Sequence, residues 1–153
     1  MFVWKDTVRI YDTDAAGLLF FASQFRLINN AFDEFMSKGG FQWTQAGAFA
    51  HRKSTAGGVI TAVVHAESDY LSSLAVGDRI SIEVKPIKVG NSSFHLSYLI
   101  KRARKLVGSG QTIHVCLTLD KDVIPIPSKL KKYLKGDLWA SIFVRFANKI
   151  YML

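Results

Sequence analysis

Apolar and polar residues alternate at the start of the chain and then recur with a helical period. Residues 2–10 follow the period of two that is typical of a half-buried strand, and the small polar residues 12–17 indicate a turn after it. From Ser23 to Lys38 the apolar residues fall on one face at helical spacing. That face consists of Phe25, Ile28, Phe32, Phe35 and Met36. Ser23 is therefore expected to cap the helix, and the glycine pair after Lys38 to end it.

The rest of the chain predicts strands joined by short connections. Residues 41–58 are rich in glycine and alanine and look irregular, whereas 59–70 are β-branched and aromatic enough to form one long strand. Shorter runs with a period of two follow at 80–84, 94–100 and 113–119. Gly108-Ser109-Gly110 is expected to break the pattern between the last two runs.

The predicted order of elements is a strand, a long helix and then several strands, which indicates an α+β fold. Consecutive hairpins favour an antiparallel sheet, and the helix must cover one of its faces. Pro125 and Pro127 end the sheet because proline cannot donate to a ladder, and a short helix is expected at 128–134. We assign residues 1–136 to one domain. Residues 137–153 carry an apolar stripe at helical spacing and form a predicted extension, which would dock on the protein body, on a neighbouring subunit or on a membrane surface.

Length and composition narrow the class of protein. A chain of 153 residues can bury one core but not two substantial ones. The single cysteine, Cys116, excludes an intrachain disulfide and a CxxC pair, and its place in an alternating strand predicts a small buried side chain. The charged start is unlike a secretory signal, so the cytoplasm is expected, and no apolar run is long enough for a membrane span. The net charge of +8 favours anionic partners, although it also serves solubility alone.

The turn before the long helix contains two carboxylates. Asp12 and Asp14 flank one threonine, and such a sequence commonly forms an ordinary turn. Here it lies between a strand and a helix, within the segment VRIYDTDAAGLLFFA of residues 8–22. This segment resembles the signature of the 4-hydroxybenzoyl-CoA thioesterase family of hotdog proteins, which has Asp-x-Asp-x-x-Gly at this junction. Supporting positions are Gly77-Asp78, His114-Val115 and Ile124-Pro125.

The resemblance spans about residues 4–134 and carries expectations of fold, activity and assembly. It implies a hotdog fold, in which an antiparallel sheet wraps around one long central helix. It implies hydrolysis of an acyl-CoA thioester with no metal or redox cofactor, because coenzyme A is part of the substrate. It also implies a homo-oligomer, either a dimer or a tetramer, with the site between subunits. The unpaired sheet edges of a single protomer fit that expectation.

By the same resemblance, Asp14 is the catalytic carboxylate, acting as a nucleophile or as a general base on water, and the backbone N–H of Phe21 donates to the oxyanion. The residues expected to line the substrate pocket are Gly17, Phe20, Phe21 and Gln24. The position agrees with physical chemistry, because N–H groups at a helix start are unpaired and the macrodipole makes that end positive. Asp12 is expected to form the turn rather than to act as a second catalytic acid.

The residue at position 21 indicates which members of this family the chain resembles most. Many relatives carry histidine or tyrosine at this position, whereas Phe21 with the nearby Gln24-Phe25 pair resembles the 1,4-dihydroxy-2-naphthoyl-CoA thioesterases of quinone biosynthesis. A ring beside the thioester suits a flat bicyclic acyl group, since ring contacts add about 0.5–1.5 kcal/mol beyond area burial. Three alternatives stay open: Phe21 only packs in the core, the substrate is a fatty acyl-CoA or an acyl carrier protein thioester, or the chain is a non-catalytic module that binds acyl groups or nucleic acid.

Basic residues and histidines complete the set of candidates. Arg102 and Arg104 lie before a predicted hairpin turn and are candidates to bind the phosphates of coenzyme A, with a solvated hairpin end as the alternative. Nucleic-acid binding is not expected, because the aromatic residues fall on predicted buried faces. His114 is expected to be a hydrogen-bonded structural residue. The other histidines are isolated along the chain, so no metal site is expected.

Overall fold

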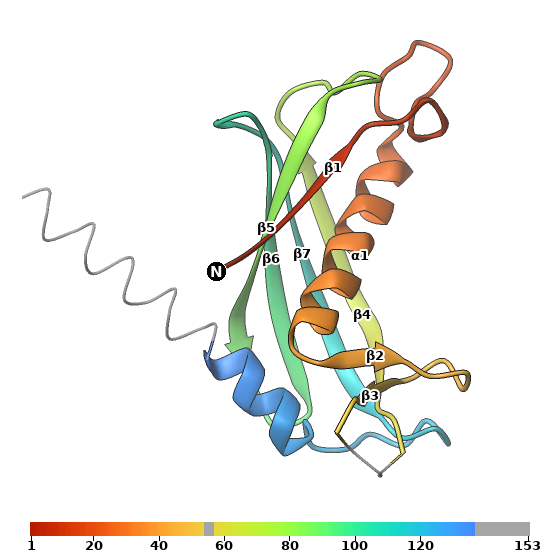
Figure 1. The fold of residues 1–153 in the computed structure, drawn as a ribbon, viewed down its shortest axis with the longest axis vertical. Coiled ribbons are helices and arrows are strands. Elements are labelled where there is room, and N and C mark those ends of the chain that lie inside the picture. The colour runs from red at the N-terminus through yellow and green to blue at the C-terminus, as the bar shows by residue number, and fades with distance from the viewer. Residues whose placement is uncertain (54–56, 137–153) are drawn as a thin grey trace, which may run out of the picture.

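The computed structural model describes residues 1–53 and 57–136, which are drawn in colour in Figure 1. The predicted helical extension at 137–153 lies outside the described residues, so the domain boundary at 136 stays a prediction. Within the described residues, no helix is long and apolar enough to cross a membrane.

The described residues form a five-stranded antiparallel sheet and a separate two-stranded one. The large sheet has the order β1-β5-β6-β7-β4, so β5, β6 and β7 pair as successive hairpins and β4 occupies an edge. Its strands are β1 (Phe2–Thr7), β4 (Ile60–Tyr70), β5 (Arg79–Val89), β6 (Ser93–Arg102) and β7 (Lys105–Leu117). Strands β2 (Phe41–Trp43) and β3 (Phe49–His51) pair in the segment predicted to be irregular. That prediction is wrong, because Phe41 and Phe49 are buried and anchor this small hairpin in the core.

Helix α1 (Phe21–Lys38) lies alongside the large sheet, as Figure 1 shows. Its buried face includes Leu27, Ile28 and Phe35, each at most 2% exposed. On β6 the buried positions follow the predicted period of two, and they are Phe94, Leu96, Tyr98 and Ile100. The predicted α+β arrangement, with one long helix covered by an antiparallel sheet, is confirmed.

The start of α1 differs from the prediction. The helix begins at Phe21, its N-cap is Phe20, and no side chain caps it. Ser23, the predicted cap, lies inside the first turn, where its N–H donates to the carbonyl of Phe20 at 2.9 Å. A backbone hydrogen bond holds the residue before the helix instead: the N–H of Phe20 donates to the carbonyl of Asp12 at 2.9 Å. Asp12 ends a short 3-10 helix, η1 (Ile10–Asp12).

Strand β7 is continuous through the glycines that were expected to interrupt it. The hairpin turn instead lies at the start of β7, where Ala103 has a φ of 55°. The glycines have a packing role: a Cβ at Gly110 would lie 2.6 Å from Cδ1 of Ile28 on α1. Glycine here allows the helix and the sheet to approach closely.

The end of the described chain closes the core at the C-terminal end of α1. Residues 128–136 are helical, so the short helix predicted at 128–134 is confirmed. Leu130 and Leu134 are fully buried, and the hydroxyl of Tyr133 donates to the carbonyl of Phe35 at 2.7 Å. Cys116 on β7 is also fully buried, as predicted.

Candidate active site

The Asp14 carboxylate is held in a tight turn before α1. Its Oδ1 accepts hydrogen bonds from the backbone N–H groups of Ala16 at 2.8 Å and Leu18 at 3.2 Å. The carbonyl of Leu18 in turn accepts from the N–H of Asp14 at 2.8 Å. Gly17 closes this turn with a φ of +76°, a conformation that favours glycine. The turn fixes the Asp14 side chain while leaving it exposed to solvent.

The N-terminus of α1 offers hydrogen-bond donors beside this turn. Among the described residues, no acceptor pairs with the backbone N–H groups of Phe21 and Ala22, the first two residues of the helix. Unpaired donors at a helix start carry part of the positive end of the macrodipole. Such donors can stabilise negative charge on an oxygen atom that is brought to them.

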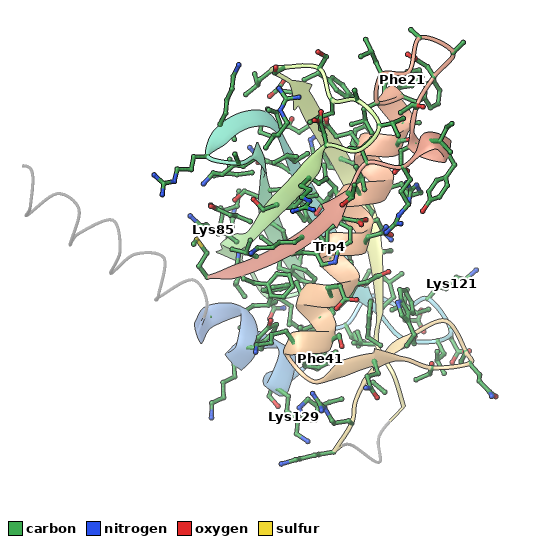
Figure 2. All side chains as sticks on the ribbon, turned by 45° about the horizontal axis from the view of Figure 1, so that its top comes forward. Trp4, Phe21, Phe41, Lys85, Lys121 and Lys129 are labelled. Atoms are coloured by element: carbon green, nitrogen blue, oxygen red, sulfur yellow. The ribbon has the colours of Figure 1, made fainter. Side chains whose placement is uncertain are left out.

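A pocket of about 540 Å³ joins the turn and the helix start. The structure brings four of the predicted site residues to its wall, namely Asp14, Phe20, Phe21 and Gln24. Gly17, which was also expected there, is not among the lining residues and instead shapes the turn. Figure 2 shows Phe21 at one end of the molecule, with Phe41 and Lys129 toward the other. The ring centroids of Phe20 and Phe21 lie 4.4 Å apart, and the two residues are 41% and 63% exposed.

Another part of the wall of this pocket comes from the last residue of β4 and the residues after it, which sequence reasoning missed. Tyr70 and Leu71 line it, followed by the polar pair Ser72-Ser73. The Tyr70 hydroxyl donates to the carbonyl of Phe21 at 2.6 Å and thereby ties the strand to the helix start. The two residues are 49 positions apart, so no local pattern could reveal the contact. The polar residues directly after a long strand were the one available signal.

Asp12 has a structural position that is distinct from that of Asp14. It is 1% exposed, forms an ion pair with Arg26, and accepts a hydrogen bond from the N–H of Arg9 at 2.8 Å. It is not among the residues that line the pocket. This geometry fits the expected turn-forming role, because the carboxylate is already occupied by its neighbours.

Arg102, a predicted phosphate ligand, is held by groups of this chain. Its guanidinium donates to Oδ2 of Asp78 at 2.7 Å and to the carbonyl of Ser73 at 3.4 Å. A hydrogen bond from the N–H of Ala75, together with Arg102, lowers the pKa of Asp78. Arg102 therefore supports the loop that lines the pocket. Arg104 is exposed beside the hairpin turn, and contact of either arginine with coenzyme A stays a prediction.

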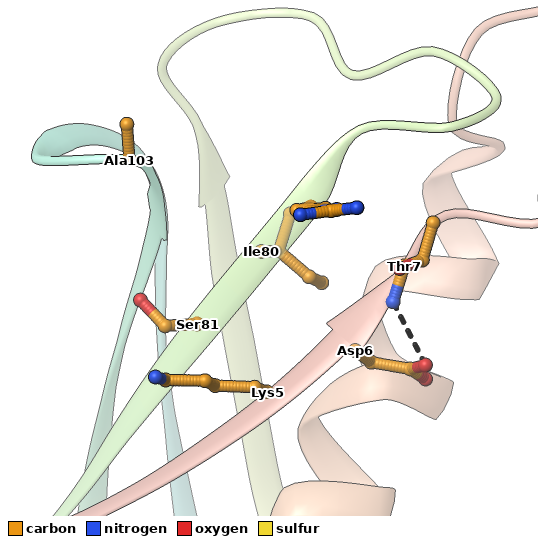
Figure 3. Close-up of a pocket in the computed structure, with 7 residues that line it drawn as sticks. Lys5, Asp6, Thr7, Ile80, Ser81 and Ala103 are labelled. Carbon is orange, nitrogen blue, oxygen red and sulfur yellow. Dashed lines mark hydrogen bonds between the residues drawn. The ribbon is translucent and has the colours of Figure 1, made fainter.

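A second pocket, of about 600 Å³, lies along the paired strands β1 and β5 near the β6–β7 turn (Figure 3). Its lining includes Lys5, Arg79 and Ala103, and the N–H of Thr7 donates to Oδ1 of Asp6 at its edge at 2.8 Å. None of the predicted site residues lines it. It therefore carries no part of the predicted chemistry.

His114 is buried, as expected of a structural histidine. It is 1% exposed, lies between the rings of Phe32 and Phe94, and shares a 2.8 Å hydrogen bond with the hydroxyl of Thr112. Burial lowers its pKa to about 4, so the ring is neutral near pH 7. Within residues 1–53 and 57–136, no group of three His, Cys, Asp or Glu side chains is placed to hold a metal ion. The expectation that no metal or cofactor is needed stays a prediction.

Comparison with known proteins identifies the family. A sequence profile described as the thioesterase-like superfamily matches residues 8–134. The chain belongs to this superfamily. Two 1,4-dihydroxy-2-naphthoyl-CoA hydrolases are similar to this thioesterase-like protein: that of Synechococcus elongatus is 31% identical over 86% of the chain and 93% of its own length, and that of Thermosynechococcus vestitus is 31% identical over 87% and 88%.

Solved structures support the same fold for this thioesterase-like protein. A 1,4-dihydroxy-2-naphthoyl-CoA thioesterase from Synechocystis superposes with a TM-score of 0.73 and 23% identity, over 87% of this chain and 94% of the other. A gentisyl-coenzyme A thioesterase, BH1999, gives a TM-score of 0.72 with 22% identity, over 87% of this chain and 98% of the other. The predictions of a hotdog fold and of thioesterase family membership are confirmed.

Proposed function

We propose that the protein hydrolyses an acyl-CoA thioester in the pocket that contains Asp14. The observation that carries the proposal is that the fixed carboxylate of Asp14 lines the same cavity of about 540 Å³ as Phe21, the first residue of α1, whose N–H has no acceptor among the described residues. Acyl transfer to water needs a group that attacks the carbonyl or activates water, and donors for the oxygen that becomes negative. Both requirements are present in this pocket.

The reaction follows from these groups. The thioester carbonyl oxygen accepts hydrogen bonds from the N–H groups of Phe21 and Ala22, which makes the carbonyl carbon more electrophilic. Asp14 either attacks this carbon, forming an anhydride that water then opens, or removes a proton from the attacking water. The carbon–sulfur bond breaks, and coenzyme A leaves as the thiolate and takes up a proton. The products are the free acid and coenzyme A.

We propose the 1,4-dihydroxy-2-naphthoyl group of quinone biosynthesis as the acyl group. Relatives that share 31% identity over most of their length carry the name of that hydrolase. The adjacent rings of Phe20 and Phe21 give the pocket an aromatic wall, which suits a flat arene. Fatty acyl-CoA and acyl carrier protein thioesters are the competing substrates, and the basic surface of the chain would suit the acidic carrier.

We propose that the working enzyme is a homo-oligomer in which the edge strand β4 takes part. This strand ends the large sheet, and Val63 and Val64 on it are 50% and 62% exposed. A long edge strand with exposed apolar residues is suited to pairing with another strand. Because Tyr70 at its end lines the Asp14 pocket, a partner on β4 would lie beside the site.

The test is a hydrolysis assay with 1,4-dihydroxy-2-naphthoyl-CoA, benzoyl-CoA, decanoyl-CoA and a decanoyl carrier protein. We expect the aromatic thioester to give the highest kcat/KM. Asp14→Asn should lower kcat at least 100-fold, because general-base catalysis typically contributes 10²–10⁴-fold. The amide oxygen of asparagine can still accept from Ala16 and Leu18, so the melting temperature should not change. Faster turnover of the fatty thioesters would exclude the naphthoyl substrate, and unchanged hydrolysis by Asp14→Asn would exclude the catalytic assignment.

A further inference from the structure

Lysine side chains gather on the helix of residues 128–136, at the end of the molecule opposite the Asp14 turn (Figure 1). This helix contains four lysines and no acidic residue. Leu130 and Leu134 are fully buried and hold one side of it against the core. The exposed lysines lie on the other side, and they are Lys129, Lys132 and Lys135. The outward side of the helix is therefore uniformly positive.

Cations from two other segments lie at the same end. Lys38 belongs to the last turn of α1, and Arg52 and Lys53 follow β3. The N–H of Arg52 donates to the carbonyl of Gly40 at 2.9 Å, which places this segment beside the end of α1. The hydroxyl of Tyr133 ties the lysine-bearing helix to a carbonyl near the same end. Three segments that are distant in sequence thus bring positive charge to one part of the surface.

We call these exposed side chains the basic end, and they are Lys38, Arg52, Lys53, Lys129, Lys132 and Lys135. Burial and then the positive charges of Lys129 and Arg52 lower the pKa of His51, the last residue of β3, so cations of different segments act on one ring. Among the described residues, no carboxylate forms an ion pair with any of the six. Cations without internal partners attract an anionic surface.

The segment that follows the lysine-bearing helix is apolar and aromatic in sequence. Residues 137–153 lie outside the described residues, and they contain only three charged side chains. Their four aromatic residues are Trp139, Phe143, Phe146 and Tyr151. Tryptophan and tyrosine are enriched where a bilayer meets water, because part of each side chain is apolar and part forms hydrogen bonds. Arg145 and Lys149 disfavour a membrane span and suit a segment at the bilayer surface.

We propose that the basic end binds the surface of an anionic phospholipid bilayer, and that residues 137–153 supply apolar side chains to the same contact. Lipid phosphates would provide the negative charges that the six cations do not find among the described residues. Attachment by apolar residues is strengthened by electrostatic attraction to anionic lipids, and stable binding commonly needs both. The Asp14 pocket lies at the other end of the protomer, so it would face away from the bilayer (Figure 1).

The same features disfavour two other partners of the basic end. Two copies of the chain that met through this surface would bring like charges together, which is unfavourable. A nucleic acid would satisfy the cations but would not use the apolar residues that follow them. An anionic bilayer is the partner that uses both.

Co-sedimentation of the full chain with lipid vesicles tests the proposal. One set of vesicles is phosphatidylcholine alone, and the other contains about one-third phosphatidylglycerol. We expect the wild type to bind the anionic vesicles at least about tenfold more tightly, and to lose affinity as salt is added. Lys129→Glu, Lys132→Glu and Lys135→Glu together should lower the affinity at least about 30-fold, since each cation near an anionic surface contributes about fivefold.

A second variant combines Arg52→Glu with Lys53→Glu and should lower the affinity about tenfold or more. These residues lie outside the helix, so a folding defect in one variant does not decide the outcome.

The matched control reverses three exposed cations near the β6–β7 turn, at the other end of the sheet, and it consists of Lys5→Glu, Arg79→Glu and Lys105→Glu. It changes the net charge by the same amount as the lysine variant. Its affinity should stay within about threefold of the wild type, because charges farther than a Debye length from the bilayer are screened. Melting temperatures show whether each variant is folded.

The apolar contribution is tested by Phe143→Ser with Phe146→Ser, which keeps the charge and should lower the affinity at least about tenfold. A folded double variant with wild-type affinity would overturn the role of residues 137–153. Equal binding of the wild type to neutral and anionic vesicles, or equal losses in the control and the lysine variant, would overturn the role of the basic end. Salt-sensitive binding to duplex DNA without binding to vesicles would overturn the proposal in favour of a nucleic acid. None of these measurements depends on thioester hydrolysis.

Discussion

The side-chain amide of Gln24 donates to the hydroxyl of Ser68 at 2.6 Å and to the carbonyl of Asp69 at 3.0 Å. This contact joins the first turn of α1 to the edge strand β4, and Gln24 is 2% exposed although it lines the Asp14 pocket. The Ser68 hydroxyl then donates to the carbonyl of Ser109 at 2.8 Å, which extends the connection to β7. The helix start is thus held to β4 by the buried side chain of Gln24, and through the Ser68 hydroxyl to β7.

Replacing Gln24 with methionine should weaken both stability and catalysis. The shape is kept, but the carbonyl of Asp69 loses a buried donor, so we expect a loss of about 1–3 kcal/mol in the free energy of unfolding. Displacement of the helix start should also raise KM, because the donors at Phe21 and Ala22 move with it. Denaturant unfolding and steady-state kinetics test this. A variant with wild-type stability would show that the buried amide contributes nothing.

The lowered pKa of His114 predicts that the folded protein becomes less stable in acid. Its pKa is about 4 in the folded protein and 6.5 when unperturbed, so the unfolded chain binds a proton more readily. The contribution of His114 is fully present above pH 6.5 and is lost as the pH falls from 6.5 to about 4. It amounts to about 3 kcal/mol, at 1.36 kcal/mol for each pKa unit.

Denaturant unfolding at several pH values between 7 and 4 measures this loss. His114→Gln removes the titrating group, so its stability should change less over the same range than that of the wild type. Equal pH dependence in the two proteins would assign the acid sensitivity to other residues.

If copies of the chain pair through the edge strand β4, a charged residue on this strand should weaken their assembly. Val64 is 62% exposed and lies at an irregularity in the β4–β7 pairing, and Val64→Lys should disfavour strand pairing between copies. We expect sedimentation to show a shift toward monomer and kcat/KM to fall with it. Val76→Lys is the control, because Val76 is 50% exposed but lies in the loop before β5. An unchanged mass for Val64→Lys would place the subunit contact elsewhere.

Gly110→Ala should destabilise the protein by about 1–3 kcal/mol, as is typical of overpacking. The added methyl group would meet Cδ1 of Ile28 at 2.6 Å and the carbonyl of Glu67 at 3.1 Å. Gly136→Ala is the control, since no atom of residues 1–53 and 57–136 lies within 4 Å of the position that its Cβ would take. Thermal unfolding measures both. Equal melting temperatures would mean that α1 can shift away from β7 without loss.

The same glycines show what sequence could and could not predict. Periodicity located α1 and the long strands because burial on one face imposes a regular spacing, and the Asp14 turn was found because its residues are adjacent. Gly108 and Gly110 were misread because glycine serves both tight turns and close packing. Their partners on α1 are distant in sequence, as Tyr70 is from Phe21, and such pairs become visible only in the folded chain.

The missing side-chain cap at Phe20 has an evolutionary consequence. A serine or aspartate at this position would bond to the N–H of Ala22 or Ser23 and stabilise the helix by about 1 kcal/mol. It would also bring a competing acceptor to the donors that the thioester oxygen needs. Selection for thermal stability alone would therefore favour a substitution at position 20 that lowers activity. The uncapped start of α1 thus represents a compromise between stability and catalysis.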